Sequence, residues 1–130
     1  MTVNKNEKFR ILVLEDEPSL QEVVKDKLTY AGFEVFAVNS VHAALAVLDN
    51  PDKIDAIWLD HYLLGESDGL DFVIMLKSSD KFKNIPIFVV SNTASPDKIQ
   101  SYIHLGVTAT YVKADVHLAD IINDVKKALA

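Results

Sequence analysis

The chain has 130 residues, of which 49% are hydrophobic, so its length and composition fit one domain with a sizeable core. It contains no cysteine, which excludes disulfide bonds and thiolate metal sites. Its formal net charge of −6 opposes direct nucleic-acid binding, and no apolar run approaches the roughly 20 residues of a membrane-spanning helix. We therefore expect a cytoplasmic protein that contacts neither nucleic acid nor a membrane directly.

The first half of the chain is typical of a polar tail followed by two strand–helix pairs. Residues 1–8 form the tail, and a single domain is expected over residues 9–130. Pro18 suits the first turn of a helix, with Asp16 or Glu17 as its N-cap. The expected elements are a strand at 9–15, a helix from Pro18 to a stop at Gly32, a strand at 33–38, and a helix at 41–50 capped by Ser40.

The second half repeats the alternation three more times. A loop is expected at 61–69, after the third strand, and Asp68 and Asp115 are the expected N-caps of the third and fifth helices. The expected elements are a strand at 54–60, a helix at 69–79, a strand at 85–91, a helix opened by Pro96 and closed by Gly106, a strand at 107–113 and a helix at 116–130.

Regular alternation of strands and helices predicts a parallel sheet with helices on both faces. Right-handed crossovers then leave few topologies. We predict an α/β fold of the flavodoxin-like kind, a doubly wound five-stranded parallel sheet with strand order 2-1-3-4-5 and five helices. The second strand contains Glu34 and is the natural edge of the sheet.

Four of the apolar strands end on polar residues of different chemical kinds. They are followed by Glu15 and Asp16, by Asp60, by Ser91 and by Lys113. Ligands bind beyond the carboxyl ends of the strands in open parallel sheets, so we expect these side chains to meet. Clustered carboxylates favour a hard cation such as Mg²⁺, and a carboxylate can attack phosphorus. Taken singly, each residue is equally typical of a helix cap, a turn or a solvated surface position.

The remaining polar and aromatic residues give weaker signals. His61 directly follows Asp60, so alternation along the chain predicts that its side chain points away from the acidic residues. No metal-ligand spacing connects the other histidines, which are His42, His104 and His117. Tyr102 and Ile103 fit either a partner surface or the core.

At this point the chain resembles the receiver domains of two-component response regulators, from Phe9 to Leu129. The resemblance rests on "ILVLEDEPSL", "IWLDHYLLGESDGLDF", "IPIFVVSNTA" and "GVTATYVKAD". It implies that Asp60 is the phosphoacceptor and that Mg²⁺ (or Mn²⁺) is ligated by Asp16, Asp60 and the backbone carbonyl of Tyr62, with Glu15 acting mainly through water. It further implies that Ser91 and Lys113 bind the phosphoryl group.

The family resemblance also implies a function and its partners. A histidine kinase or a histidine phosphotransfer protein would donate the phosphoryl group, and the modified domain would switch a surface for a downstream protein. The protein would catalyse phosphorylation and dephosphorylation of itself, without acting as an enzyme on an outside substrate. Tyr62 and Thr93 would flank the path of the attacking water, where a bulky Tyr62 is expected to prolong the lifetime of the phosphoryl group.

Several positions depart from the family pattern. Glu15 stands where aspartate is usual, and Ala114 stands where proline is frequent, so the usual cis peptide is not expected there. Thr110 occupies the place of the switch aromatic, and Tyr111 next to it should face the other way.

Two other readings compete with a phosphorylated receiver. The departures at Thr110 and Ala114 favour a receiver-like scaffold that binds a partner without phosphorylation. The second alternative is an aspartate-nucleophile phosphohydrolase. That class commonly needs a second aspartate two residues after the nucleophile, where this chain has Tyr62, so we disfavour it.

Overall fold

The computed structural model describes residues 8–50, 52–61, 69–92 and 95–130. Most of the expected tail and of the loop after the third strand lies outside these residues. The expected cap Asp68 and the expected site residues Tyr62 and Thr93 therefore also lie outside them.

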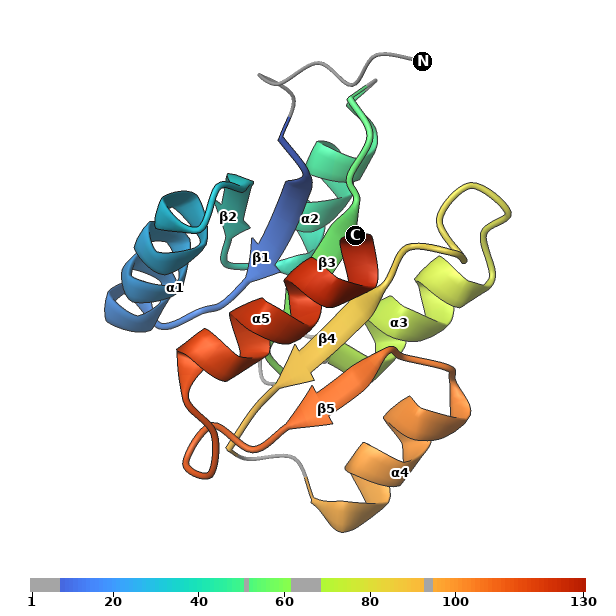
Figure 1. The fold of residues 1–130 in the computed structure, drawn as a ribbon. Coiled ribbons are helices and arrows are strands. Elements are labelled where there is room, and N and C mark those ends of the chain that lie inside the picture. The colour runs from blue at the N-terminus through green and yellow to red at the C-terminus, as the bar shows by residue number, and fades with distance from the viewer. Residues whose placement is uncertain (1–7, 51, 62–68, 93–94) are drawn as a thin grey trace.

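The described strands form one parallel five-stranded sheet in the order β2-β1-β3-β4-β5, which confirms the predicted topology (Figure 1). The edges are β2, as predicted, and β5. The strands are β1 (Arg10–Leu14), β2 (Glu34–Val38), β3 (Ala56–Leu59), β4 (Ile87–Val90) and β5 (Ala109–Tyr111). All strands except β2 are followed by one of the polar residues named above, and each of these four strands ends one or two residues before it, so the polar residues lie at the start of the loops.

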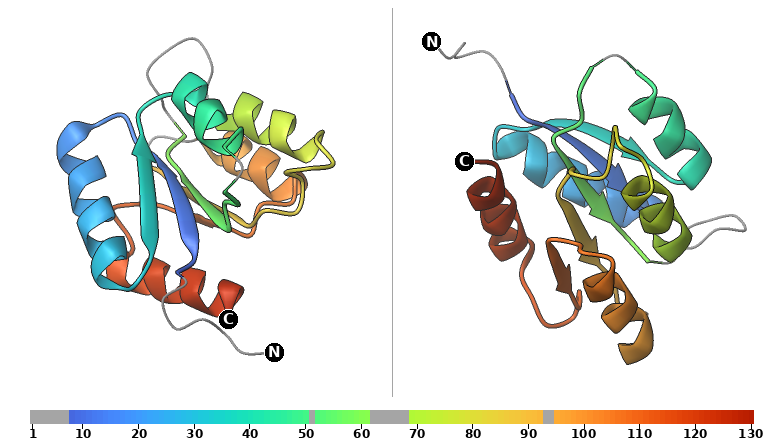
Figure 2. Two further views of the ribbon diagram at one scale, coloured as in Figure 1. Left: turned by 90° about the horizontal axis from the view of Figure 1, so that it is seen from above. Right: turned by 90° about the vertical axis from the view of Figure 1, so that its right-hand side faces the viewer.

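Two layers of helices cover the sheet. In Figure 2, α1 and α5 lie on one face, and α2, α3 and α4 lie on the other. The helices are α1 (Pro18–Tyr30), α2 (Val41–Leu48), α3 (Gly69–Lys77), α4 (Pro96–His104) and α5 (Leu118–Leu129). No helix of the described residues has the length and apolar character needed to cross a bilayer.

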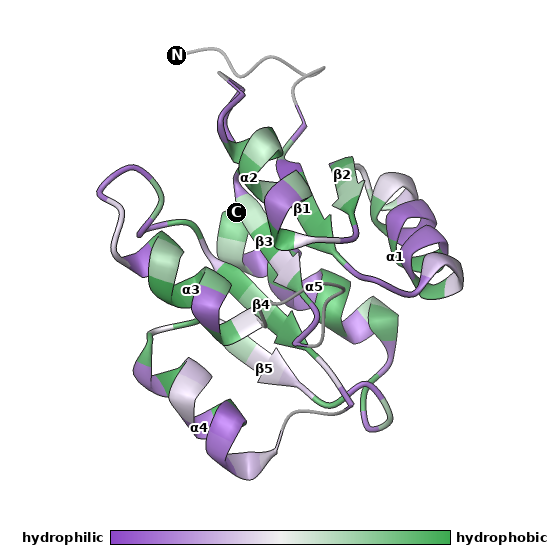
Figure 3. Cartoon of the chain, turned by 180° about the vertical axis from the view of Figure 1, so that it is seen from behind, coloured by the Kyte–Doolittle hydropathy of each residue, from purple (hydrophilic) through white to green (hydrophobic). Residues whose placement is uncertain are grey.

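The sheet separates two hydrophobic clusters. Along β1, Leu12 and Leu14 face the cluster shared with α2, α3 and α4, whereas Ile11 and Val13 face the cluster shared with α1 and α5. Because helices bury both faces, the central strands are apolar at nearly every position, as the green strands of Figure 3 show. This packing holds the carboxyl ends of β1, β3 and β4 in fixed relative positions.

The helix ends confirm some of the expected caps and correct others. The Ser40 hydroxyl accepts a hydrogen bond from the Ala43 amide at 3.1 Å, as expected of an N-cap. Gly32 and Gly106 have φ of 104° and 85°, which glycine tolerates best, and both follow a helix end as predicted. The predicted cap Asp115 is wrong, because its amide donates to the Val112 carbonyl in a turn and α5 begins only at Leu118.

At α1 the N-cap position is Glu17, one of the two expected residues, but its side chain makes no capping hydrogen bond. Pro18 at the first helical position lacks an amide hydrogen, so one of the donors that a cap normally satisfies is absent. The side chain of Gln21 instead donates to the Glu15 carbonyl at 3.0 Å, which ties α1 to the end of β1.

Candidate functional site

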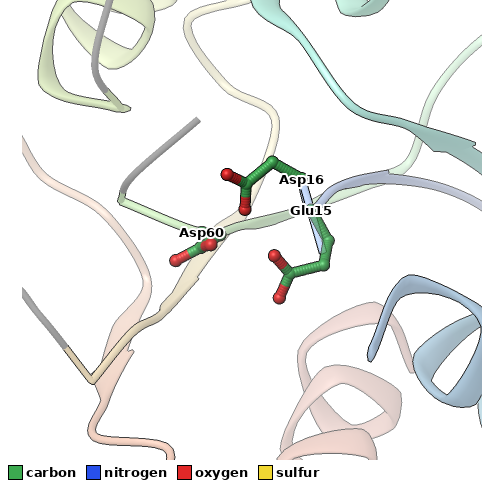
Figure 4. A group of neighbouring side chains, drawn as sticks. All are labelled: Glu15, Asp16 and Asp60. Atoms are coloured by element: carbon green, nitrogen blue, oxygen red, sulfur yellow. The ribbon is translucent and has the colours of Figure 1, made fainter. Parts of the chain in front are cut away.

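Three carboxylates converge beyond the ends of β1 and β3. Glu15, Asp16 and Asp60 each offer an oxygen, and these oxygens lie within 4.8 Å of one another (Figure 4). Backbone hydrogen bonds continue the sheet one residue further, from the Glu15 amide to the Val38 carbonyl and from the Asp60 amide to the Leu14 carbonyl. The sheet therefore brings together acidic residues that follow two different strands in the sequence.

Lys113 reaches this acidic cluster from beyond β5. Its Nζ lies 2.7 Å from Oε1 of Glu15 and 3.7 Å from Oδ2 of Asp60. Ser91 is brought beside it, because the Ser91 amide donates to the Tyr111 carbonyl and the Lys113 amide donates to the Ser91 carbonyl. Ser91 and Asp60 are both buried. All five strand-end residues singled out from the sequence thus lie at one rim of the sheet.

The surroundings of the two buried acids, Glu15 and Asp60, shift their pKa values in opposite directions. Burial, with the hydrogen bond and the charge of Glu15, raises the pKa of Asp60 to about 7, because these effects together outweigh the lowering effect of the Lys113 charge. Burial also acts to raise the pKa of Glu15, but its hydrogen bonds with Asp60 and Lys113 and the Lys113 charge lower it overall. The lysine amine lies closer to Glu15 than to Asp60, in line with these opposite shifts of the two pKa values.

The donor set of the cluster matches a hard divalent cation. Three carboxylates supply oxygen ligands only, which suits Mg²⁺ or Mn²⁺ better than a metal that prefers nitrogen or sulfur. The imidazole of the neighbouring residue, His61, faces Tyr102 of α4 and does not belong to this donor set. A bound cation would offset both the burial of the Asp60 charge and its repulsion by the neighbouring carboxylates.

A hydrogen bond joins the loops after β4 and β5, and the sequence did not indicate it. The Ala114 amide donates to Oδ1 of Asn92 at 2.7 Å. Proline at position 114 would have no such donor. Among the described residues no peptide bond is cis, in agreement with the expectation for Ala114. Asn92 and Ala114 directly follow Ser91 and Lys113, so the bond holds these two residues in a fixed relation.

The aromatic residue of β5 faces away from α4, as predicted. Tyr111 packs with the cluster shared by α1 and α5, and its hydroxyl donates to Oδ2 of Asp124 at 2.7 Å. Burial, together with Asp124, raises the pKa of Tyr111. Thr110 is in register with Val89 of β4 and shares its face of the sheet, toward α4.

His61 also points away from the carboxylates, as predicted, and it has a partner that the sequence did not indicate. Its Nδ1 lies 2.6 Å from the hydroxyl oxygen of Tyr102 on α4, within hydrogen-bond distance and out of contact with solvent. Tyr102 therefore belongs to the core, whereas Ile103 is 52% exposed. The two partners are 41 residues apart, and nothing in their spacing predicts the contact.

Comparison with known proteins decides which family has this site. The model of the family "Response regulator receiver domain" matches residues 11–126. The chain belongs to this family. The match spans both acidic strand ends, Ser91 and Lys113, so the residues gathered at the rim all fall within the receiver domain.

Two relatives show how far the sequence similarity extends. The two-component response regulator ORR13 of Oryza sativa subsp. japonica is 28% identical over 111 residues, which cover 85% of this chain and 90% of the relative. Chemotaxis protein CheY1 of Helicobacter pylori (strain ATCC 700392 / 26695) is 25% identical over 110 residues, covering 81% and 85%.

Two solved structures confirm the fold of the receiver domain. A response regulator receiver protein from Pseudomonas putida superposes with a TM-score of 0.85 at 23% identity, covering 93% of this chain and 98% of that chain. The phosphorylated cyanobacterial phytochrome response regulator RcpA gives a TM-score of 0.77 at 25% identity, covering 94% and 91%.

Family membership establishes the general function. The protein is a phosphoacceptor signalling domain of the two-component class rather than an enzyme for an outside substrate. Receiver domains generally bind Mg²⁺ at an acidic pocket, and this chain has such a cluster. Response regulators of two-component systems interact with histidine kinases and with downstream effectors.

Proposed function

We propose that Asp60 is the phosphoacceptor of this receiver domain and that residues 9–130 act as one unit. The observation that carries the proposal is the convergence around a buried carboxylate of one amine and two further acids. Asp60 lies near Lys113, which can neutralise a phosphoryl oxygen, and near Glu15 and Asp16, which can hold a cation. Neutralisation and positioning are the main requirements of phosphoryl transfer.

The donor in this proposal is a phosphohistidine of a histidine kinase or a histidine phosphotransfer protein. One carboxylate oxygen of Asp60 attacks the phosphorus, and the bond between phosphorus and the donor imidazole breaks. The bonding electron pair goes to the ring nitrogen, the other ring nitrogen carries a proton so that neutral imidazole leaves, and an acyl phosphate forms on Asp60. The signal ends by hydrolysis. A water oxygen attacks the same phosphorus, the bond to the carboxylate oxygen breaks, and inorganic phosphate leaves.

The other residues of the rim support this transfer in separate ways. Asp16 and Asp60, with the backbone carbonyl of Tyr62 and with Glu15 through water, would hold Mg²⁺ or Mn²⁺. When bound, the cation supplies positive charge to the phosphoryl oxygens. Lys113 pairs with the phosphoryl group or with Asp60, and the Ser91 hydroxyl donates to a phosphoryl oxygen. The location of the domain in the cytoplasm belongs to the same proposal.

The proposal also covers the rate of hydrolysis and the output of the domain. Tyr62 and Thr93 would tune the lifetime of the phosphoryl group by controlling access of water. Thr110 takes the switch position on β5 without an aromatic ring. We propose that α4, β5 and α5 carry the surface that a downstream protein partner recognises.

Mass spectrometry tests the proposal directly. Wild type, Asp60→Asn and the matched control Asp80→Asn, whose side chain is fully exposed, are incubated with acetyl phosphate and Mg²⁺. We expect the mass of one phosphoryl group on wild type and on Asp80→Asn and none on Asp60→Asn. An increment on Asp60→Asn would place the acceptor elsewhere. The absence of an increment on wild type would support the scaffold that works without phosphorylation.

A further inference from the structure

We propose that the hydrogen bond between His61 and Tyr102 links the phosphoacceptor to helix α4, so that phosphorylation of Asp60 and the placement of α4 are coupled through it. The inference rests on the proposed phosphorylation of Asp60. It assigns His61 and Tyr102 as positioning residues, because neither contacts the reacting atoms. Three observations on the described residues support it.

The first observation is the covalent link to the acceptor. His61 is the residue after Asp60, and its backbone carbonyl accepts a hydrogen bond from the Gly69 amide, the first residue of α3, at 2.9 Å. Neighbouring α-carbons across a trans peptide are held about 3.8 Å apart, so a displacement of the Asp60 backbone also displaces His61. The side chains of the two residues lie on opposite sides of the chain, one in the charged cluster and one in the core.

The second observation is how α4 is attached to the rest of the domain. Within α4, Tyr102 is the one buried residue, and it is fully buried. Its hydroxyl lies 2.6 Å from Nδ1 of His61, and the two rings meet edge to face at 89° with their centroids 5.6 Å apart. Separating these polar atoms in a dry core is unfavourable, so α4 is expected to follow His61 rather than to leave it.

The third observation is the lack of space around the tyrosine hydroxyl. A Cβ atom added to Gly69 would collide with the Tyr102 hydroxyl and would also lie 3.3 Å from the backbone of His61. The end of β3, the start of α3 and the buried side of α4 thus meet at one tightly packed junction. Packed junctions of this kind transmit small displacements because they cannot absorb them.

The other aromatic near the sheet edge does not offer the same link. Tyr111 is bonded to Asp124 of α5 on the opposite face of the sheet. It is therefore a matched control, since Tyr111→Phe removes one hydrogen-bonded hydroxyl without touching the His61 junction.

Hydrogen exchange on the full chain tests the coupling. Backbone exchange across 96–104 is measured by mass spectrometry with and without acetyl phosphate and Mg²⁺, and the intact mass reports the phosphorylated fraction in each sample. In wild type and Tyr111→Phe we expect phosphorylation to change the exchange rate of α4 by about fivefold or more, a typical allosteric coupling. In Tyr102→Phe, which keeps the ring, and in His61→Leu, we expect the response to fall to less than half of the wild-type value at an equal phosphorylated fraction.

The outcomes separate this inference from the proposed function. An α4 response of wild-type size in either junction variant would overturn the link, as would a phosphorylated wild type whose α4 exchange does not change. A wild type that gains no phosphoryl mass would instead overturn the assignment of Asp60. Since His61→Leu changes the core more than Tyr102→Phe does, circular dichroism checks that each variant is folded. Tyr102→Phe alone decides the matter if the leucine variant does not fold.

Discussion

Asp60 and His61 are neighbours in the chain, but they belong to two regions with opposite physical character. The charged cluster around Asp60 contains ionisable groups that are partly in contact with solvent, and the Lys113 side chain remains 21% exposed. The junction around His61 is buried, and it contains the hydrogen bond to Tyr102, the packing of the two rings and a glycine. Groups in the first region can redistribute when a charge is added, whereas those in the second can only move together.

The difference shows that one peptide bond connects the charged cluster, where phosphoryl transfer is proposed, to the packed core. Alternation at the end of β3 sends one side chain to the rim and the next into the core. We therefore expect substitutions at the rim to change phosphoryl transfer with modest effects on folding. Substitutions at the junction should change stability and the response of α4 while leaving the acceptor chemistry in place.

The largest expected effect is at Lys113. Lys113→Met removes the amine that lies near Glu15 and Asp60, and we expect the rate of phosphorylation by acetyl phosphate and Mg²⁺ to fall by about a hundredfold, as for the loss of one transition-state donor. The matched control is Lys83→Met, whose ion pair with Asp80 lies at the surface and should matter little. Equal rates for wild type and Lys113→Met would separate this lysine from the transfer.

Gly69→Ala tests the packing of the junction. The new methyl group meets the Tyr102 hydroxyl, so we expect the free energy of unfolding, measured by urea denaturation, to fall by about 1–3 kcal/mol. Tyr102→Phe in the same chain removes the clashing oxygen and should restore part of the loss. If the double variant shows only the sum of the two single losses, the hydroxyl is not what excludes a side chain at position 69.

The raised pKa of Asp60 predicts a pH dependence in metal-free protein. The folded state holds this proton up to about pH 7, against an ordinary pKa of 3.8, so between these values it binds more protons than the unfolded state. The stabilising contribution is complete below the ordinary value and is lost as the pH rises through 7. At pH 7.5 we expect Asp60→Asn to be more stable than wild type by about 1–2 kcal/mol.

The advantage of Asp60→Asn should shrink toward pH 5, and Mg²⁺ at pH 7.5 should stabilise wild type more than the variant, because the cation binds the ionised acid. Thermal or urea unfolding across this pH range measures both effects. A difference between the two proteins that stays constant with pH would mean that Asp60 titrates normally.

The smallest expected effect is on the free energy of unfolding when one of two tyrosine hydroxyls is removed. Tyr102→Phe removes a hydrogen bond from the buried junction and should lower the free energy of unfolding by about 1 kcal/mol or more. Tyr111→Phe removes a bond made near the surface, and its cost should be smaller. The reverse order in urea denaturation would show that the junction adds little to stability.

The sequence by itself determined the sheet and the membership of the rim. Apolar runs that end in Glu15, Asp60, Ser91 and Lys113 predict both results, because buried parallel strands are apolar throughout and their carboxyl ends share one edge. The direction of His61 and of Tyr111 followed from the same alternation. These features depend on the order of residues along single strands, and the sequence shows that order directly.

Only the tertiary structure decided which residues meet between elements. The bond from His61 to Tyr102, the glycine that makes room for it and the bond from Ala114 to Asn92 all join separate segments. The start of α5 at Leu118 rather than after Asp115 likewise depends on the turn that precedes it. Such contacts depend on how far each helix is shifted and rotated against the sheet. The packing of the whole core sets that position. The hydrophobic period of a single helix does not encode it.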